Sequence, residues 1–324
     1  MKAIIVTEYG PPEGFVVADV PAPEPGPDDL LIDVRAAGIS FVDMLVAQGN
    51  YQVKPPLPFV PGTEFSGVVA DVGSNVEGFR KGDKVLSGAM GGAYADQCAV
   101  PAISAVRMPE AMTFEHGSVF RVSYATACYA MVQRGQVQPG ETVLVLGAGG
   151  AVGTACVQMA KALDARVIGS ASTEAKRALA VQCGADETID RGAEDWRDQV
   201  KALTSGKGVD VVVDPVGGDE TERAFRSLGW KGRHLVIGYA AGSIPKLPVN
   251  LALLKGSALV GVDVRQFGIF EPDLYRENLI RLAEFYEAGK TVPPIYATHP
   301  RTDFKVAMRS VIDGTAIGRV VLTN

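Results

Sequence analysis

The feature that most constrains the fold is an alternation of apolar runs and helical patterns in the second half of the chain. The apolar runs contain almost no polar residues, which is typical of strands buried on both faces, and the segments between them carry apolar residues at helical spacing. The runs are 142–146, 165–168, 209–213, 234–237 and 258–262, and the helical patterns include 151–163 and 173–183. Buried strands that alternate with helices predict an α/β fold with a doubly wound parallel sheet.

Residues 1–108 have a different pattern, with short strands separated by Gly and Pro and only a weak helical signal. This spacing predicts a β-rich, barrel-like antiparallel domain. A chain of 324 residues suits two domains. The last apolar run, 318–322, is too short to fold alone, so we expect it to return to the N-terminal domain. The predicted division is residues 1–121 with 264–324, and residues 122–263.

The strongest chemical signal is a glycine-rich turn between a predicted strand and a predicted helix. Glycines in such a turn let the backbone approach a pyrophosphate, whose charge is met by free N–H groups and the positive end of the helix. The spacing is a variant of the dinucleotide-binding fingerprint, and the strand–helix units that follow strengthen this interpretation. The residues predicted to bind the dinucleotide here are Gly147, Gly150, Ala151, Val152 and Gly153.

The next predicted strand ends without the acidic residue that NAD-binding proteins offer to the ribose hydroxyl. Hydroxyl and basic side chains follow instead, and these would accommodate a 2′-phosphate, which favours NADPH (NADP⁺) over NADH. The residues predicted to lie there are Ser170, Ser172, Lys176, Arg177 and, after the following strand, Arg191. Further predicted cofactor contacts are Thr126, at the nicotinamide end, and Val216, Gly238, Tyr239, Val262 and Arg319.

Several segments together resemble the quinone oxidoreductase branch of the medium-chain dehydrogenase/reductase superfamily. They are residues 36–43, 55–64, 147–153, 214–218 and 232–238. The resemblance implies a GroES-like substrate domain built from both ends of the chain, a central Rossmann domain and an active-site cleft between them. It also implies a homodimer paired through the strand near 259–262.

The resemblance also predicts that the chain binds no zinc. Zinc-dependent members of the superfamily carry Cys at or beside Ser40 and His in place of Thr63, and many have a cluster of four cysteines. The three histidines and four cysteines of this chain are scattered, whereas zinc needs three or four converging ligands. Without a Lewis acid to polarise a carbonyl, reduction of an already conjugated acceptor is favoured over alcohol oxidation.

Candidate catalytic side chains are hydroxyl groups expected at the cleft, together with one arginine. Related reductases usually have Asn in place of Ser40 and often Tyr in place of Leu45, so their polar groups do not transfer directly to this chain. The hydroxyl candidates for binding the substrate or the nicotinamide ribose are Ser40, Tyr51, Tyr94 and Tyr124, each of which could instead be structural, and Asp43 is a candidate brace of the fold. Arg121, with Arg265, is hypothesised to bind an anionic acceptor; the alternative is a surface arginine.

The formal net charge of −6, with no run of like charges, indicates neither a nucleic-acid nor a membrane partner. No apolar segment is long enough to form a signal peptide or a membrane span, which favours a cytoplasmic protein. The sequence therefore predicts an NADPH-dependent reductase of a small conjugated acceptor such as a quinone. An enoyl or 2-alkenal reductase and a cofactor-binding module with little turnover remain alternatives.

Overall fold

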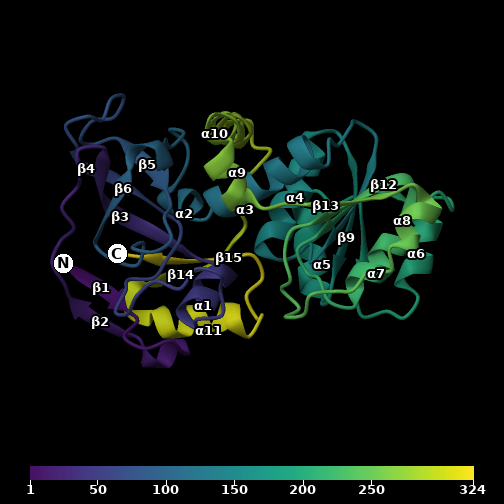
Figure 1. The fold of residues 1–324 in the computed structure, drawn as a ribbon, viewed down its shortest axis with the longest axis horizontal. Coiled ribbons are helices and arrows are strands. Elements are labelled where there is room, and N and C mark those ends of the chain that lie inside the picture. Colours follow the sequence, from purple (N-terminus) through teal and green to yellow (C-terminus); the bar gives the residue numbers. More distant parts are fainter. The chain divides into compact units, whose positions relative to one another are not determined.

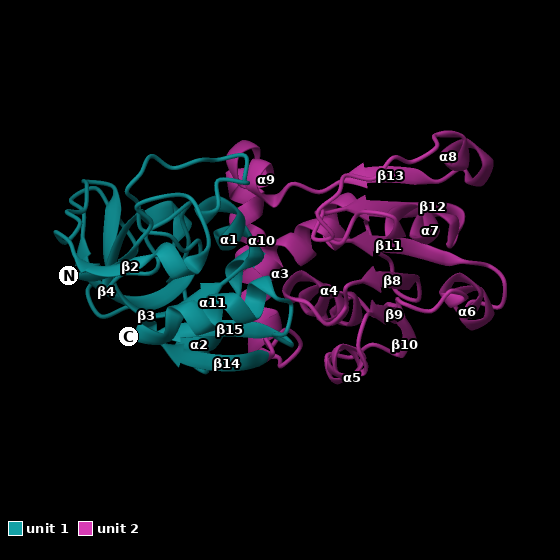
Figure 2. Cartoon of the chain, turned by 90° about the horizontal axis from the view of Figure 1, so that it is seen from below, with its two compact units in different colours: residues 1–122, 295–324 teal, residues 123–294 magenta.

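The computed structural model describes residues 1–324, which form two compact units. Unit 1 comprises residues 1–122 and 295–324, and unit 2 comprises residues 123–294 (Figure 2). Unit 1 is therefore discontinuous in sequence, and both ends of the chain belong to it. No helix is long and apolar enough to span a membrane.

Unit 1 is built on a seven-stranded sheet with the order β14-β15-β3-β4-β5-β7, and β6 pairs with β3 (Figure 1). The pairs are antiparallel except β14 with β15. The last strand lies beside β3, with Val321 opposite Gly38, which confirms that the C-terminal run returns to the N-terminal domain. The strands are β1 (Lys2–Ile5), β2 (Val16–Asp19), β3 (Asp29–Ile39), β4 (Phe65–Val72), β5 (Lys84–Ser87), β6 (Gln97–Pro101), β7 (Val106–Arg107), β14 (Ile295–Pro300) and β15 (Arg319–Thr323).

Three helices belong to unit 1: α1 (Phe41–Ala47), α2 (Phe114–Gly117) and α11 (Phe304–Ile312). The sequence shows little helical signal before residue 108, and α1 is the exception in that region. This helix begins at Ser40 with a capping box, in which Ser40 and Asp43 bond each other's backbone N–H groups. The helix is only 7 residues long, so its start depends on this cap rather than on a long amphipathic repeat.

Unit 2 contains a six-stranded parallel sheet in the order β10-β9-β8-β11-β12-β13. This is the strand order of a Rossmann fold, and it confirms the predicted doubly wound sheet. The strands are β8 (Thr142–Leu146), β9 (Arg166–Ala171), β10 (Glu187–Asp190), β11 (Val209–Asp214), β12 (Leu228–Val236) and β13 (Ala258–Gly261). The helices between and after them include α4 (Ala151–Ala162), α5 (Glu174–Gln182), α6 (Trp196–Leu203), α7 (Glu220–Arg226) and α8 (Asn250–Lys255).

The predicted division is wrong for residues 264–294, which it grouped with the N-terminal domain. They contain α9 (Val264–Phe270) and α10 (Pro272–Glu287) and belong to unit 2. Helix α3 (Arg121–Cys128), which belongs to unit 2 from Ser123 on, continues into a π-helical turn in unit 2. The Phe267 ring stacks on Tyr129 of this turn at 4.0 Å between centroids, and Asn278 exchanges two hydrogen bonds with Gln133. The second boundary therefore lies after residue 294.

Candidate active site

The glycine-rich turn joins the end of β8 to the start of α4 in unit 2. Gly147 has a φ of +62°, a conformation that glycine adopts without strain. The turn is closed by a 2.9 Å hydrogen bond from the Gly150 N–H to the Gly147 carbonyl. Another 2.9 Å bond, from the Ala148 N–H to the Ser170 carbonyl, ties it to β9. The turn is therefore held from within and from the neighbouring strand.

Two glycines of this turn lie where a side chain would clash with neighbouring atoms. A Cβ atom on Gly153 would lie 2.0 Å from the Gly147 carbonyl oxygen, so the first turn of α4 packs directly on the loop. A Cβ on Gly149 would likewise lie 2.5 Å from the Cβ of Lys176 on α5. No side chain caps α4 at Gly150, and the first N–H groups of a helix have no partner within it. These residues therefore form a backbone cradle for an anion at a helix N-terminus.

The cradle lies at the switch point of the sheet, because β8 has β9 on one side and β11 on the other. The turn after β11 is its neighbour: a Cβ on Gly147 would lie 3.0 Å from Cγ2 of Val216. Gly217 in turn approaches Tyr239, whose Cδ1 would lie 2.8 Å from a Cβ at that position. The predicted cofactor residues Val216 and Tyr239 thus lie, like the glycine-rich turn, at the carboxyl-terminal ends of the strands.

Gly238 and Val262 lie at the ends of the next two strands. The Gly238 N–H donates to the Asp214 carbonyl at 3.3 Å, and the Val262 N–H donates to the Val236 carbonyl at 2.9 Å. Val262 is buried, whereas Tyr239 is exposed. The carboxyl ends of β8, β11, β12 and β13 therefore carry most of the predicted cofactor residues.

Beneath the turn after β11, the buried carboxylate of Asp214 accepts four hydrogen bonds. Its Oδ1 accepts the N–H groups of Val216 (3.0 Å) and Gly217 (2.8 Å). Its Oδ2 accepts the Thr221 hydroxyl (2.6 Å) and Nε2 of His234 (3.0 Å). Burial by itself would raise the pKa of Asp214, but the hydrogen bond and charge of His234, with the other donors, hold that pKa below its usual value.

This cluster is not among the features predicted from the sequence, in which the histidines are scattered side chains that bind no metal. The available signal is Asp214, which follows the 209–213 run and lies three residues before the pair Gly217-Gly218. Such an Asp can accept the backbone N–H groups of the turn that follows it. The contribution of His234 had no local signal, because it comes from another strand.

The tip of β9 carries the residues predicted to meet a 2′-phosphate. Ser172 is exposed there, and Lys176 lies at the start of α5, which Thr173 caps. Arg191 is half-buried and its N–H donates to the Ala171 carbonyl at 3.1 Å, so β10 ends beside β9. Arg177 bonds the same carbonyl and pairs with Asp190 at 3.0 Å. Ser170 is a correction, because its side chain is completely buried in the sheet.

In unit 1, two predicted hydroxyl groups have structural partners. Ser40 is buried, and its hydroxyl donates to Asp43 Oδ2 at 2.8 Å while it caps α1. Tyr94 is 1% exposed, and its hydroxyl lies 3.1 Å from the Gly38 carbonyl and 3.0 Å from Asp43 Oδ2. Tyr94 is therefore corrected from a substrate-binding candidate to a buried brace, and Asp43 is the centre that both hydroxyls support.

Arg319 is also corrected, from a cofactor contact to a partner of a buried acid. It forms an ion pair with Glu64, whose other oxygen accepts the Val122 N–H at 3.0 Å. Burial raises the pKa of Glu64, with Arg319 opposing it. Burial likewise raises the pKa of Asp43, although donors such as Ser40 oppose it. Each acid is thus held in an environment that favours its neutral form more than water does.

The remaining candidates are placed as follows. Arg121 is half-buried, and its Nη1 would lie 2.7 Å from a Cβ on Gly88, so the guanidinium rests against that backbone. Tyr124 is buried in unit 2, and its hydroxyl donates to Gln158 at 2.6 Å, which gives it a structural role. Thr126 is buried on the same helix, whereas Tyr51 is half-buried in unit 1.

No group of three or more His, Cys, Asp or Glu side chains is arranged to hold a metal ion. The four cysteines are free and buried, and burial raises the pKa of Cys98, Cys128 and Cys156 to about 12. The thiols are therefore protonated at neutral pH, as expected of buried apolar residues.

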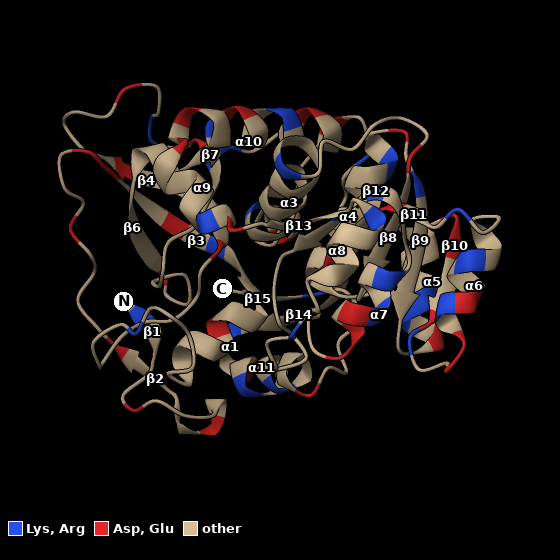
Figure 3. Cartoon of the chain, turned by 45° about the vertical axis from the view of Figure 1, so that its right-hand side comes forward, with Lys and Arg blue, Asp and Glu red and all other residues tan.

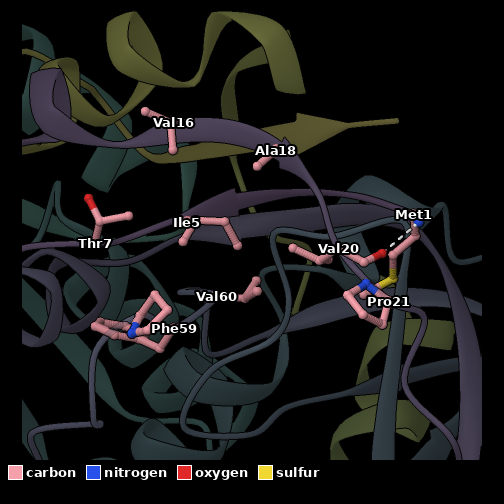
Figure 4. A pocket seen from close by; sticks show the side chains of 10 residues that line it. Met1, Ile5, Thr7, Val16, Ala18, Val20, Pro21, Phe59 and Val60 are labelled. Atoms are coloured by element: carbon pink, nitrogen blue, oxygen red, sulfur yellow. Dashed lines mark hydrogen bonds between the residues drawn. The ribbon is translucent and has the colours of Figure 1, made fainter.

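Unit 1 also has an open apolar groove of about 460 Å³ between the β1–β2 pair and the Pro58–Val60 segment (Figure 4). Ile5, Val16 and Phe59 line it, together with other residues that have no ionisable side chain. None of the predicted catalytic or cofactor residues lies in this groove.

Comparison with known proteins identifies both parts of the chain. Residues 26–110 match the alcohol dehydrogenase GroES-like domain, and residues 151–284 match the zinc-binding dehydrogenase family model. Quinone oxidoreductase-like protein 2 of Mus musculus is 36% identical, over 99% of this chain and 92% of that protein. Human quinone oxidoreductase is 30% identical, over 99% of this chain and 97% of that protein.

Solved structures agree with these sequence matches. Mycobacterial Rv1454c, solved in complex with NADPH, superposes with a TM-score of 0.92 and is 30% identical, with 100% of each chain covered. Escherichia coli quinone oxidoreductase, also complexed with NADPH, gives a TM-score of 0.90 at 27% identity, again with 100% of each chain covered. From its sequence, its fold and these relatives, the chain belongs to the quinone oxidoreductase branch of the medium-chain dehydrogenase/reductase superfamily.

Proposed function

We propose that this chain is an NADPH-dependent reductase that delivers a hydride to a small conjugated acceptor, with a quinone as the leading candidate. The observation that carries the proposal is the backbone cradle at the start of α4, where a Cβ on Gly153 would lie 2.0 Å from the Gly147 carbonyl oxygen. The loop backbone packs directly on the first turn of the helix, with no side chain between them, so a pyrophosphate could approach the N–H groups at the helix N-terminus. Two structural neighbours solved with NADPH support the same cofactor.

The residues of this chain that would hold the cofactor follow from the geometry of unit 2. The N–H groups of Ala151, Val152 and Gly153 would meet the pyrophosphate, and the turn containing Val216 would border the nicotinamide half. When bound, NADPH supplies the hydride. The protein's task is to orient the two reactants and to provide hydrogen bonds for the charge that develops on the acceptor oxygen.

Preference for NADPH over NADH would come from the tip of β9. Ser172 is exposed there, and Arg191 and Lys176 lie just after β10 and in the first turn of α5. Arg177 is already paired with Asp190. We therefore assign the 2′-phosphate to Ser172, Lys176 and Arg191, with a smaller role for Arg177. Arg191→Ala should lower the ratio of kcat/KM for NADPH to that for NADH about tenfold, since one charged hydrogen bond is of that order. Arg197→Ala, an exposed arginine on α6, is the matched control.

A more specific candidate is an anionic acceptor, such as an acrylate-type acid or an acyl thioester, held by Arg121. The guanidinium is half-buried against Gly88, rather than extended into solvent as a surface arginine would be. Planar guanidinium groups bind carboxylates through paired hydrogen bonds. Arg121→Met should raise KM for anionic acceptors and leave KM for neutral quinones unchanged. An equal rise for both classes would contradict this assignment, and Arg265→Met tests the second arginine separately.

The test of the function is NADPH oxidation, followed by absorbance, with a naphthoquinone, an enone, an acrylate and an enoyl thioester. NADH replaces NADPH in one control, and a chelator is added in another. Turnover of the quinone that is faster with NADPH and unaffected by chelator is the expected result. Turnover only of the enone or the thioester would favour the enoyl or 2-alkenal reductase. NADPH binding without turnover of any acceptor would favour a cofactor-binding module.

We further propose that the protein acts as a homodimer. Strand β13 is the edge of the unit 2 sheet, and exposed apolar side chains surround that edge. They include Trp230, Leu253, Leu254 and Leu259, which are 72%, 80%, 70% and 51% exposed. An unpaired strand edge beside such a surface suits pairing with a second copy. Leu259→Lys should shift the mass measured by light scattering from dimer to monomer, whereas Ile103→Lys, exposed in unit 1, should leave it unchanged.

The charge distribution gives no sign of a nucleic-acid partner. Lys, Arg, Asp and Glu are interspersed, for example along α6 and α10 (Figure 3). Nucleic-acid binding depends on clustered basic residues. We therefore propose small molecules and a second copy of the chain as its partners.

A further inference from the structure

His234 lies on β12, inside unit 2, and its imidazole is completely buried. Its Nε2 is 3.0 Å from Asp214 Oδ2, and its ring stacks near Phe225 with centroids 5.8 Å apart. Because the ionised carboxylate can only accept, Nε2 must carry the hydrogen. Nδ1 is buried and makes no hydrogen bond. The only polar contact of this ring is therefore the one to Asp214.

The other oxygen of Asp214 binds the turn that follows β11. Oδ1 accepts the N–H groups of Val216 and Gly217 at 3.0 and 2.8 Å. Gly217 and Gly218 have φ values of +69° and +63°. Glycine adopts positive φ values about as readily as negative ones, so hydrogen bonds such as these fix the conformation of the turn. The carboxylate thus determines where the turn lies.

The turn then contacts the cofactor cradle itself. Val216 Cγ2 would lie 3.0 Å from a Cβ on Gly147, and Tyr239 closes on Gly217 from the other side. A small displacement of the Asp214 carboxylate would therefore move Val216 relative to Gly147. A continuous series of contacts leads from His234 through Asp214 and Val216 to the glycine-rich turn.

We propose that His234 is a positioning residue for the cofactor: as a donor to Asp214, it holds the Val216–Gly218 turn in the conformation that NADPH binds. The inference rests on the proposed NADPH binding of unit 2. His234 is fully buried and does not itself touch the cofactor. Its effect is therefore expected on NADPH affinity rather than on the chemical step.

The experiment compares two substitutions of His234. His234→Phe keeps a flat ring but removes the donor, and it should raise the Kd for NADPH about tenfold, because a hydrogen bond to a charged group is of that order. His234→Gln can place an amide N–H where Nε2 lies, and it should restore most of the affinity. In the same variants, KM for NADPH should follow Kd, while kcat at saturating NADPH stays within about twofold of the wild type.

Thr204→Val is the matched control for loss of a buried hydrogen bond in unit 2. The Thr204 hydroxyl donates to the Val200 carbonyl at 2.9 Å and accepts the Gly208 N–H at 3.1 Å, without contact to the cradle. This variant should lower Tm and leave the Kd for NADPH unchanged. If His234→Phe behaves in the same way, with lower Tm and wild-type Kd, the positioning role is wrong.

Two further outcomes are distinguishable. If the wild-type protein does not bind NADPH at all, the proposed function fails, and the role of His234 fails with it. If His234→Phe does not fold, His234→Asn replaces it, because its shorter amide cannot reach the position of Nε2. Wild-type affinity in the Asn variant would overturn the inference, and a weakened affinity that the Gln variant recovers would support it.

Discussion

Each unit buries an aspartate in a cluster of hydrogen bonds, but the two aspartates are held in opposite ways. In unit 2, both oxygens of Asp214 accept bonds, and the donors hold its pKa below the usual value despite burial. In unit 1, three donors converge on Oδ2 of Asp43, while Oδ1 has none, and burial raises its pKa. Burial alone therefore does not decide the direction in which the pKa of such a group shifts.

The difference comes from what surrounds each carboxyl. Asp214 faces His234 and a turn of backbone N–H groups, so both of its oxygens have donors. Asp43 has donors on one oxygen only, and its burial is the largest cause of its raised pKa, with those donors opposing it. At Asp214 the donors on both oxygens outweigh the effect of burial on the pKa, whereas at Asp43 burial outweighs the donors, which reach one oxygen only.

The largest expected difference is between the two isosteric substitutions. Asp214→Asn replaces an ionised acceptor with a group whose amide hydrogens face existing donors. It should lower the free energy of unfolding by about 3 kcal/mol. Asp43→Asn should cost less, about 1 kcal/mol, because the raised pKa of Asp43 shows that its site already favours, more than water does, the neutral carboxyl that Asn resembles. Urea denaturation measures both, and equal losses would contradict the comparison.

The pH dependence of stability should have opposite signs for the two groups. The lowered pKa of Asp214 adds stability above the ordinary Asp value of about 3.9, and this stability is lost as pH falls through the folded pKa. The raised pKa of Asp43 adds stability below that value, and this stability is lost as pH rises toward the folded pKa. Subtracting each Asn variant's urea-derived curve from the wild-type curve should therefore give a rising difference for Asp214 and a falling one for Asp43.

Removal of a single hydroxyl donor should have the smallest effect. Thr221→Val removes one of four bonds to Asp214, and Ser40→Ala removes the cap of α1, so each should cost about 1 kcal/mol. Thermal unfolding measures both losses. Ser40→Ala also tests a catalytic role: if Ser40 serves only as a cap, kcat with the quinone should stay within about twofold of the wild type. A much lower kcat in a folded variant would restore Ser40 as a candidate for substrate binding.

Much of unit 2 could be predicted from the sequence because its signals are local. Buried parallel strands are continuous apolar runs, and the glycines of the 147–153 turn are recognised by their spacing between a strand and a helix. Ser170 was predicted wrongly because a hydroxyl near a strand tip indicates a polar site, whereas its place in the buried strand decides its burial. The hydroxyl candidates of unit 1 were harder to place, since a Ser or Tyr in the sequence does not indicate whether its partner is a substrate or a buried acid.

The sequence alone determined the doubly wound sheet and the anion cradle, since each depends on the periodicity or spacing of neighbouring residues. It also indicated the return of the C-terminal strand, because that run is too short to fold alone. Only the tertiary structure decided that Tyr94 braces Asp43, that Arg319 pairs with Glu64 and that α9 and α10 belong to unit 2. It also brought His234 to Asp214, because β12 lies beside β11 in the sheet. Such contacts join residues that are distant along the chain, so they depend on strand order and packing, which no local pattern encodes.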